Sequence, residues 1–582
     1  MIIEEINKHF KLPIEYVKND NLFIIDNETI DDLELKGTDK SKCIYDYVLE
    51  PTNDFAMTTT QKWGKHYTDD KQFLTDTQKL LKKFRKFDNS NNLQNLNDEK
   101  DEANKNFEIY KLLNDVKSNK SFRSQYLYFD WDFIETFNHY AFCLEMLCLY
   151  TMLSPILSII FPILMLFVPL IILRFRGMNI TFKSYSEFLK KTLKNHTLGV
   201  FFTDFSKLTL YQTVYTGFSV FIFFFNVYQN ILTCLRFNNN IKDIQDNIDL
   251  VKNYIYNISK KVKHFIQYTK DLSSYRLFND KLESVNHQLN NYYNEIKTIK
   301  PFERSISKFL EIGEIMKQYY FFYDDVTLYE NLLYSFGFIG YIDNLEGIQK
   351  NITNKSVNFC KFTKKYNTFN QLYYPFLKNE DPIKNNVKLD NNIIITGPNA
   401  AGKTTIIKSV IINTILSQQL GLGFYKKAKI HPYQYMHCYI NIPDTSGRDS
   451  LFQAEARRCK NIIDILSDKN DSRHLCILDE LYSGTNPYEA VSGGYAYINY
   501  LNKYKNFNFI LTTHFIDLCE KFDNHKNINN FYMNATISDN KMNYTYKIKS
   551  GISKIKGGIQ VLRELGYPEE IVKESSYILE NL

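Results

Sequence analysis

A glycine-rich loop between an apolar strand pattern and a helical pattern is the strongest constraint in this 582-residue sequence. Residues 393–405 read IIITGPNAAGKTT, and the apolar stretch IIKSVIINTIL continues from Ile406. Glycines let such a loop wrap closely around phosphate oxygens, and the following helix points the positive end of its dipole at them. The lysine then reaches the β- and γ-phosphates, and the next hydroxyl coordinates Mg²⁺. The sequence therefore predicts a P-loop that binds ATP and Mg²⁺ through Gly397, Asn399, Gly402, Lys403, Thr404 and Thr405.

Two further apolar strand patterns end in residues that complete a nucleotide site. The segment LCILDE ends in Asp479, a candidate Mg²⁺ ligand, and Glu480, a candidate general base for the attacking water. The segment ILTTH ends in His514, at the place where ABC-type ATPases carry a histidine that senses the γ-phosphate. Together with the P-loop, these strands predict a Mg²⁺-dependent ATPase with Glu480 and His514 as catalytic residues.

The sequence around these motifs resembles the ATPase domain of the MutS DNA mismatch-repair family. The similar segments are TGPNAAGKTT (396–405), GRDSLFQAE (447–455), DELYSGTNPYEA (479–490), TTHF (512–515) and the tail YKIKSGISKIKGGIQVLRELGYPEEIVKESSYIL (546–579). The LSGGQ segment of ABC transporters is absent from the sequence. Five elements in family order make the resemblance specific, and it covers about residues 371–582.

The resemblance implies an α/β fold of the ABC-type P-loop class for residues 371–582, and a homodimer with composite ATP sites. In the family, the serine of the second segment contacts the γ-phosphate held by the other subunit. That residue is Ser450 here, with Gly484 and Thr485 near the dimer seam. DNA is the partner that the resemblance implies. Full mismatch sensors also carry a wedge domain, a connector and a clamp, for which this chain is too short, so mismatch recognition does not carry over.

Two long uncharged stretches precede the ATPase domain, at Met146–Leu173 and Leu208–Leu235. Each exceeds the roughly 20 residues that cross a bilayer core, although prolines at positions 155, 162 and 169 interrupt the first. Such stretches resemble membrane-segment-bearing MutS-like proteins of bacteria and large DNA viruses, and a pair of buried helices is the alternative. Residues 174–207 are basic, which favours the cytosolic side. We therefore expect re-entrant or interfacial insertion, because both the basic residues 174–207 and the ATPase can then lie on the cytosolic side, where ATP is available.

The remaining sequence suggests a mainly helical region before the ATPase domain. An apolar stripe over residues 241–258 recurs at spacings of three and four, which predicts a long amphipathic, lever-like helix. Residues 88–106 are poor in apolar side chains and are predicted to be a linker or disordered loop. We therefore expect four domains: a polar region of unknown role at 1–121, the apolar segments at 122–235, a helical lever region at 236–370 and the ATPase at 371–582.

Composition narrows the function further. The net charge is only +6, so any DNA-binding surface must be local. The nine cysteines form no CxxC pair, which argues against structural zinc and favours an intracellular protein. The sequence favours a dimeric ATP switch that acts on DNA in mismatch repair, recombination or genome maintenance. A membrane-associated ABC-type mechanoenzyme acting on a protein or membrane target is the alternative, and a scaffold with a degenerate ATPase is disfavoured by the intact Lys403, Asp479 and Glu480.

Overall fold

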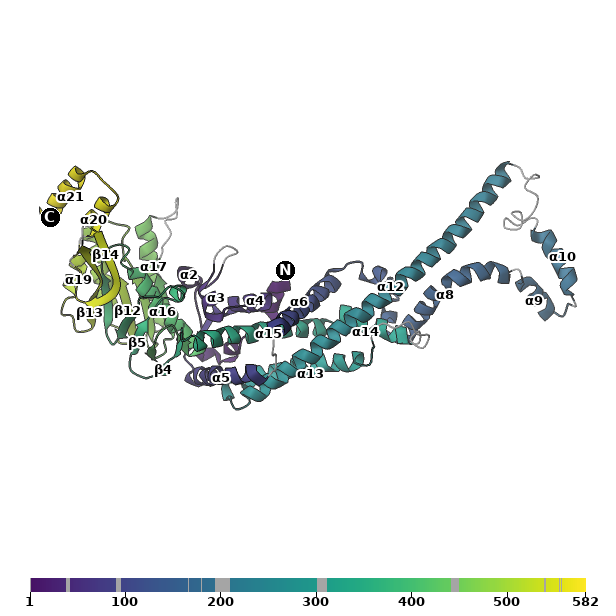
Figure 1. Ribbon diagram of the computed structural model, residues 1–582, viewed down its shortest axis with the longest axis horizontal. Helices are drawn as coiled ribbons and strands as arrows, with labels where there is room; N and C mark the ends of the chain where they lie inside the picture. The colour runs from purple at the N-terminus through teal and green to yellow at the C-terminus, as the bar shows by residue number, and fades with distance from the viewer. Residues whose placement is uncertain are drawn as a thin grey trace. The chain divides into compact units, whose positions relative to one another are not determined.

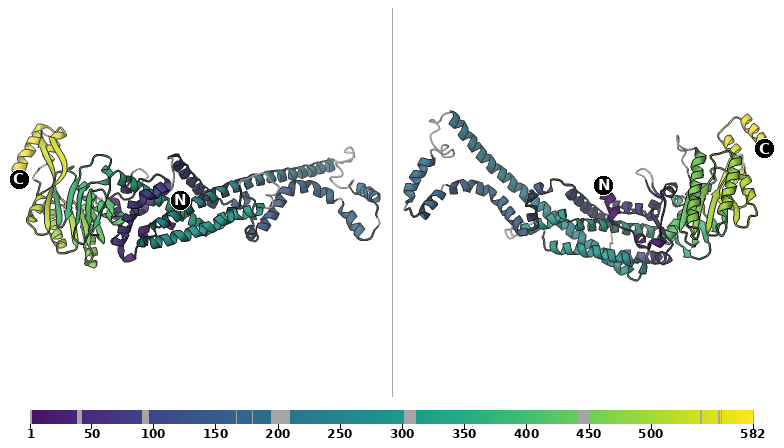
Figure 2. Two further views of the ribbon diagram at one scale, coloured as in Figure 1. Left: turned by 60° about the horizontal axis from the view of Figure 1, so that its bottom comes forward. Right: turned by 180° about the vertical axis from the view of Figure 1, so that it is seen from behind.

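Two compact units make up the chain, and Figures 1 and 2 show their elements as ribbons. The structure is a computed structural model that describes residues 2–37, 42–90, 96–165, 167–178, 180–193, 210–300, 311–440, 450–538, 541–553, 555 and 557–581. Unit 1 consists of Met1–Asn95, Val262–Val285 and Leu332–Leu582, and unit 2 consists of Leu96–Lys261 and Asn286–Asn331.

A six-stranded sheet forms the centre of the C-terminal part of unit 1. Its strand order is β10-β11-β12-β7-β13-β14, and all neighbours are parallel except β13 and β14. The inner strands are almost wholly buried, which explains their uninterrupted apolar sequences. The strands are β7 (Asn392–Thr396), β10 (Tyr435–Tyr439), β11 (His474–Asp479), β12 (Phe507–Thr512), β13 (Ile528–Ser538) and β14 (Lys541–Ser550).

Helices bury the apolar side chains of this sheet. Cys459 and Ile462 of α17, together with Ile498 of α18, join a core cluster with β7, β11 and β12. Helix α16 contacts β11 and β12 as well, and nearly all of its residues are buried. The helices are α16 (Lys403–Leu420), α17 (Leu451–Asp468), α18 (Pro487–Leu501), α19 (Ile516–Lys521), α20 (Gly557–Glu564) and α21 (Glu569–Asn581).

A four-stranded sheet of order β4-β9-β5-β6 and two two-stranded sheets, β3-β8 and β1-β2, complete the strands of unit 1. Several of these strands precede residue 371, so strand structure begins before the predicted start of the ATPase domain. Their bounds are β1 (Leu22–Ile24), β2 (His66–Thr68), β3 (Asn358–Phe359), β4 (Lys361–Phe362), β5 (Asn367–Leu372), β6 (Asn385–Leu389), β8 (Leu422–Gly423) and β9 (Lys427–Ile430).

The N-terminal residues, for which the sequence suggested no role, pack against helix α16. The Gln419 side-chain amide donates hydrogen bonds to the carbonyl oxygens of Trp63, at 2.6 Å, and His66, at 2.7 Å. The Tyr45 hydroxyl donates to Gln419 Oε1 at 2.8 Å. Two of these bonds are buried and the bond to His66 is partly buried, so together they fix this region to the helix that begins at the P-loop. The helices are α1 (Ile2–His9), α2 (Asn27–Asp32), α3 (Ile44–Leu49), α4 (Asp54–Trp63) and α5 (Lys71–Ser90).

Unit 2 is helical, and three of its helices continue into unit 1. The loop predicted over 88–106 is wrong for residues 88–90 and 96–106, because α5 continues to Ser90 and α6 begins at Leu96, while residues 91–95 lie outside the described residues. The segment is polar but rich in Glu, Lys, Asn and Ala, and several of these residues favour helices without needing burial. The helices are α6 (Leu96–Ser118), α7 (Phe122–Gln125), α8 (Ala141–Met165), α9 (Val168–Phe175), α10 (Phe182–Leu193), α12 (Leu210–Thr269), α13 (Arg276–Ile296), α14 (Ile312–Asp324) and α15 (Val326–Thr353).

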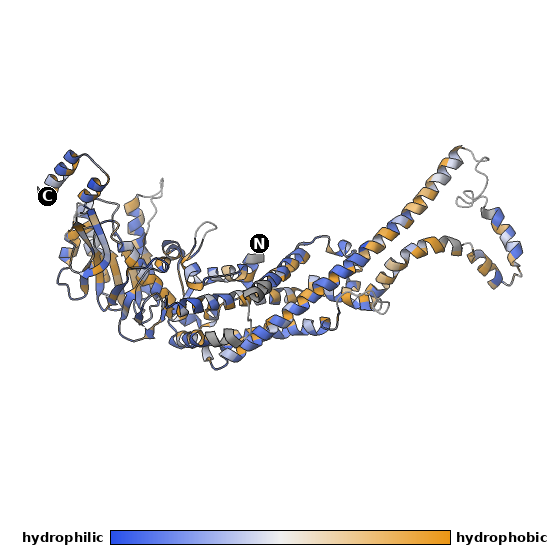
Figure 3. Cartoon of the chain, viewed as in Figure 1, coloured by the Kyte–Doolittle hydropathy of each residue, from blue (hydrophilic) through white to orange (hydrophobic). Residues whose placement is uncertain are grey.

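Helix α12 confirms the long amphipathic helix predicted over 241–258. Its apolar stripe, which includes Ile244, Ile248 and Val251, is buried. Its N-terminal part and most of helix α8 are instead uncharged and rich in apolar residues, and their ribbons are mostly orange in Figure 3. By length and composition, Ala141–Phe161 and Thr213–Thr269 could each cross a membrane. The expectation of two long apolar helical segments is therefore confirmed.

Candidate nucleotide-binding site

The glycine-rich loop connects the buried strand β7 to helix α16. Gly402 is the N-cap residue of α16 and has φ of 90°, a left-handed conformation that glycine adopts without the strain other residues suffer. Helix α16 has 18 residues, so its N-terminus presents several free amides and the positive end of a full helix dipole. The local structure therefore supplies what an anion such as a phosphate needs, as the sequence predicted.

Lys403 is held in the centre of the site by groups from three segments. Its Nζ donates hydrogen bonds to the carbonyl oxygens of Gly397, at 3.0 Å, and Pro398, at 3.2 Å. The same atom lies 3.2 Å from His514 Nε2 and 4.0 Å from Glu480 Oε1. Burial lowers the pKa of Lys403, although nearby carboxylates oppose this shift. The ammonium group is thus an almost fully enclosed cation next to the anion-binding loop.

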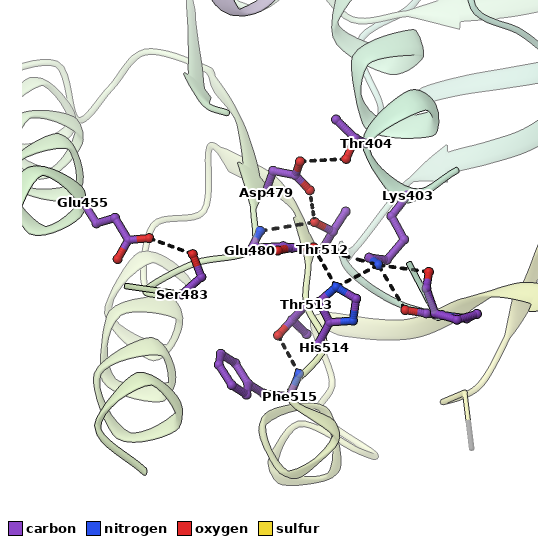
Figure 4. A network of polar contacts seen from close by, with 12 residues as sticks. Lys403, Thr404, Glu455, Asp479, Glu480, Ser483, Thr512, Thr513, His514 and Phe515 are labelled. Carbon is purple, nitrogen blue, oxygen red and sulfur yellow. Dashed lines mark hydrogen bonds and ion pairs between the residues drawn. The ribbon is translucent and has the colours of Figure 1, made fainter. Parts of the chain in front are cut away.

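Asp479 is connected to the P-loop through Thr404. The Thr404 hydroxyl donates to Asp479 Oδ2 at 2.8 Å, and the Thr512 hydroxyl donates to the other carboxylate oxygen (Figure 4). A hydroxyl and a carboxylate are the hard oxygen ligands that Mg²⁺ prefers. Among the described residues, His, Cys, Asp and Glu side chains form no group of three that could hold a metal. Thr404 and Asp479 therefore fit Mg²⁺ that takes its other ligands from phosphates and water.

Glu480 and His514 face each other at the ends of neighbouring parallel strands. His514 Nε2 lies 2.7 Å from Glu480 Oε1, and the Glu480 amide donates to the Thr512 hydroxyl at 3.3 Å (Figure 4). The hydrogen bond from His514 lowers the pKa of Glu480, and the charges of His514 and Lys403 add to this effect. Glu480 is therefore an ionised hydrogen-bond acceptor, half-buried beside the lysine.

Ser450 is the one predicted catalytic residue that lies apart from this cluster. It is the exposed N-cap of α17: its hydroxyl accepts from the Gln453 amide at 3.3 Å, and its own amide donates to Gln453 Oε1 at 3.0 Å. It is not among the residues that line the cavity around Lys403. The preceding Gly447, Arg448 and Asp449 of the same predicted segment lie outside the described residues.

Glu455 connects α17 to the loop that follows Glu480, a role that the sequence did not suggest. Its carboxylate is 2% exposed and accepts from the Ser483 hydroxyl at 3.0 Å and the Gly484 amide at 3.2 Å. A Cβ atom on Gly484 would lie 2.7 Å from Leu451 Cγ, so only glycine allows this close approach. The available signal was the position of Glu455 within the segment 447–455 that resembles the MutS family.

A cavity of about 640 Å³ extends from the P-loop to side chains that sequence reasoning missed. Its lining includes Lys403 and Thr404 together with Ile383 and Tyr546, and the Tyr546 ring lies so close to Gly402 that a Cβ atom there would be 3.2 Å from it. Both of the latter side chains are more than a third exposed, and the Asn385 amide donates to the Tyr546 carbonyl at 2.9 Å. An aromatic ring and an aliphatic side chain beside a phosphate-binding loop can hold a flat heterocycle.

Comparison with known proteins identifies the C-terminal third. The family model described as MutS domain V matches residues 393–582. The DNA mismatch repair protein MutS of Persephonella marina is 30% identical over 213 residues, which are 36% of this chain and 24% of that protein. The proteins of the same name from Phocaeicola vulgatus and Aquifex pyrophilus are each 31% identical, over 210 and 190 residues. These cover 35% and 32% of this chain.

The similarity is confined to one part of much longer proteins. The chain spans about a quarter of the length of these relatives, namely 24% of the Phocaeicola protein and 22% of the Aquifex protein. The matched residues contain the P-loop, Asp479, Glu480 and His514, which are the groups assembled in the structure. Residues 393–582 are therefore a MutS domain V, and the similarity to the MutS proteins lies in this region of the chain.

Proposed function

We propose that residues 371–582 form an ABC-type P-loop domain that binds ATP with Mg²⁺ and hydrolyses it. The observation that carries this proposal is the convergence of Lys403, Thr404, Asp479, Glu480 and His514, which come from three separate chain segments. Lys403 would neutralise phosphate charge, and Thr404 with Asp479 would hold Mg²⁺. Glu480 would orient and polarise the attacking water, and His514 would report the presence of the γ-phosphate.

Fluorescent-ATP binding and phosphate release by the purified full-length chain test this proposal directly. We expect saturable ATP binding, and phosphate release that stops when EDTA removes Mg²⁺ and resumes when Mg²⁺ is restored. Metal dependence is expected because the Thr404 hydroxyl and the Asp479 carboxylate are oxygen ligands of the kind Mg²⁺ prefers, and the metal would bridge them to the phosphates. Binding without any Mg²⁺-dependent hydrolysis would instead favour a scaffold that only binds nucleotide.

The adenine ring would occupy the cavity between Ile383 and Tyr546. Replacing Tyr546 with alanine is expected to weaken ATP binding about 5- to 150-fold, because stacking of a base on an aromatic ring contributes roughly 1–3 kcal/mol. Tyr546→Phe keeps the ring and should bind ATP normally. Inorganic tripolyphosphate, which has no base, should compete equally well for both variants. Equal weakening of tripolyphosphate and ATP binding would show that Tyr546 supports the loop and does not contact the base.

Glu455 would position the loop after Glu480 for catalysis. Glu455→Gln replaces one acceptor oxygen with an NH₂ group, which faces either the Gly484 amide or the Ser483 hydroxyl. Hydrogen bonds to a charged group contribute roughly 1.5–3 kcal/mol, so we expect turnover to fall about tenfold or more with ATP affinity unchanged. Ser483→Ala removes one of the two bonds and should have a smaller effect. Normal turnover in a folded Glu455→Gln protein, with folding checked by thermal unfolding, would contradict this role.

Hydrolysis is proposed to need two chains. The Lys403 cluster has no contribution from Ser450, which instead presents an exposed hydroxyl at the N-terminus of α17. A second copy could bring that hydroxyl, with Gly484 and Thr485 nearby, to the phosphates held by the first copy. Such a homodimer with composite sites would open and close with nucleotide, as an ATP switch.

DNA is the target we propose for this switch, in mismatch repair, recombination or genome maintenance. The support is the similarity to DNA mismatch repair proteins MutS, of which this chain matches one region. Gel shifts with matched, mismatched and branched duplexes test the proposal. Retention of branched or mismatched DNA that changes with ATP would support it. Absence of DNA binding would favour the alternative, an ABC-type mechanoenzyme acting on a protein or membrane target. In both cases we place the nucleotide site in the cytosol, where ATP is available.

A further inference from the structure

Helix α8 and the first part of α12 expose an unusual amount of apolar surface to their surroundings. Only 17% of the most apolar stretch of α8 and 6% of that of α12 are buried, so these are not core helices. Large apolar side chains are exposed along both helices, whose ribbons are mostly orange in Figure 3. Soluble proteins rarely expose contiguous apolar surface of this extent. Examples are Ile156, Phe161 and Leu164 of α8, and Phe218, Phe221 and Phe224 of α12, the last three at 61%, 63% and 63% exposure.

The change in character along α12 shows that this exposure is local. Arg236 ends the uncharged stretch, and from Phe237 onward the same helix buries an ordinary apolar stripe that includes Ile244 and Ile248. Helix α8 changes in the same way near its start, where Glu145 Oε2 accepts from the Gly313 amide at 2.7 Å and Leu144 is fully buried. Each helix therefore has one part packed within unit 2 and one part that needs a different environment.

The two apolar stretches meet at one end and have the length of a bilayer. Cys234 Sγ lies 3.9 Å from the Met152 carbonyl oxygen, so the end of the apolar part of α12 is adjacent to the start of the apolar part of α8. At 1.5 Å per residue, the uncharged parts Met146–Met165 and Leu210–Leu235 are about 30 and 39 Å long. The hydrocarbon core of a bilayer is about 30 Å thick. Helices satisfy their own backbone hydrogen bonds, as lipid requires.

Tyrosines occur near both ends of these stretches. Tyr140 and Tyr150 are exposed near the start of α8, and Tyr211 and Tyr215 are exposed at the opposite end of the apolar part of α12. Tyrosine is enriched where hydrocarbon meets headgroups, because its ring is apolar and its hydroxyl is polar. A protein partner would not require aromatic side chains at two levels separated by the thickness of a bilayer.

Exposed basic residues follow the apolar part of α8. Arg174 and Arg176 lie at the end of α9, and α10 carries Lys183, Lys190 and Lys191 on exposed positions with a single acidic residue, Glu187. A basic helix of this kind complements anionic headgroups, and each lysine or arginine near such a surface strengthens binding about fivefold.

We propose that α8 and residues Leu210–Leu235 of α12 insert into a lipid bilayer, and that α10 with Arg174 and Arg176 binds anionic headgroups. The proposal is independent of the ATPase proposal, because none of these residues belongs to the nucleotide site. A second copy of the chain or a protein partner could cover the same surface, and the experiment below distinguishes these occupants from lipid.

The test is flotation of the purified full-length chain, diluted from detergent into vesicles of phosphatidylcholine alone or with phosphatidylglycerol. We expect wild-type protein to float with both vesicles, to float better with the anionic ones, and to resist carbonate extraction. Phe221→Lys combined with Phe224→Lys should abolish flotation, whereas Leu277→Lys, a matched change of an exposed side chain on α13, should not affect it.

Lys190→Gln combined with Lys191→Gln should weaken binding to the anionic vesicles about thirtyfold and leave binding to neutral vesicles unchanged. Circular dichroism and thermal unfolding in detergent check that each variant is folded. Wild-type protein that stays out of both vesicle types overturns the proposal, whether it is monodisperse without detergent or forms a defined oligomer. The second result would assign the surface to another copy of the chain.

Discussion

Replacing Glu480 with glutamine should leave ATP binding intact and lower the rate of hydrolysis by about 10²–10⁴-fold. Losing a positioned general base has an effect of that size, because an amide cannot accept the proton of the attacking water. Glu480 is suited to this role, since His514 and Lys403 hold the pKa of its carboxyl low and keep it ionised. Phosphate release measured at saturating ATP isolates this step from binding.

Lys403→Ala should instead abolish ATP binding itself. The Lys403 ammonium is 5% exposed, and loop carbonyls hold it beside the helix N-terminus, so its removal deletes the main positive charge facing the phosphates. Asp523→Asn changes an exposed carboxylate of the same domain and should alter neither quantity. Hydrolysis at the wild-type rate in Glu480→Gln would remove the general-base assignment, and normal ATP affinity in Lys403→Ala would remove the phosphate-binding assignment.

The residues predicted best from the sequence are those at the ends of buried parallel strands. Asp479 and His514 each end an apolar run, and strands of one parallel sheet bring their carboxyl ends to the same edge. Local sequence therefore determines both the strand and the position of the functional side chain. The structure places Lys403, Asp479, Glu480 and His514 together, as expected from this rule.

Residues whose roles depend on distant segments were not predictable in this way. Ile383 and Tyr546 line one cavity although they are 163 positions apart in the sequence, and neither belongs to a recognisable motif. The Gln419 amide donates a hydrogen bond to the Trp63 carbonyl, and nothing in the polar N-terminal sequence indicates that partner. The helix over residues 96–106 was missed for another reason, because a polar helix has no apolar periodicity in its sequence.

If the ATP site is shared between two chains, mixing two inactive variants should restore ATP hydrolysis. Ser450→Ala should reduce turnover about 10²–10³-fold, as loss of one preorganised donor to a transition state does, and should leave ATP affinity of the monomer unchanged. Lys403→Ala should be inactive because it binds no nucleotide. In a heterodimer of the two, one site combines the intact Lys403 of the first chain with the intact Ser450 of the second. Random mixing in equal amounts should therefore restore about a quarter of wild-type activity.

Ser450 is also the N-cap of α17, so a local folding effect must be separated from a contact across the dimer. The hydroxyl accepts from the Gln453 amide, and replacing such a cap with alanine typically costs about 1 kcal/mol of stability. Ser450→Asp preserves the cap, because aspartate accepts the same hydrogen bond, but it offers the phosphates a negative charge in place of a donor. If Ser450 acts across the seam, Ser450→Asp should be thermally stable and inactive alone, and active when mixed with Lys403→Ala. If its only role is the cap, Ser450→Asp should hydrolyse ATP normally by itself. A mixture that forms heterodimers by cross-linking yet stays as inactive as its components would show that each chain hydrolyses ATP with its own residues.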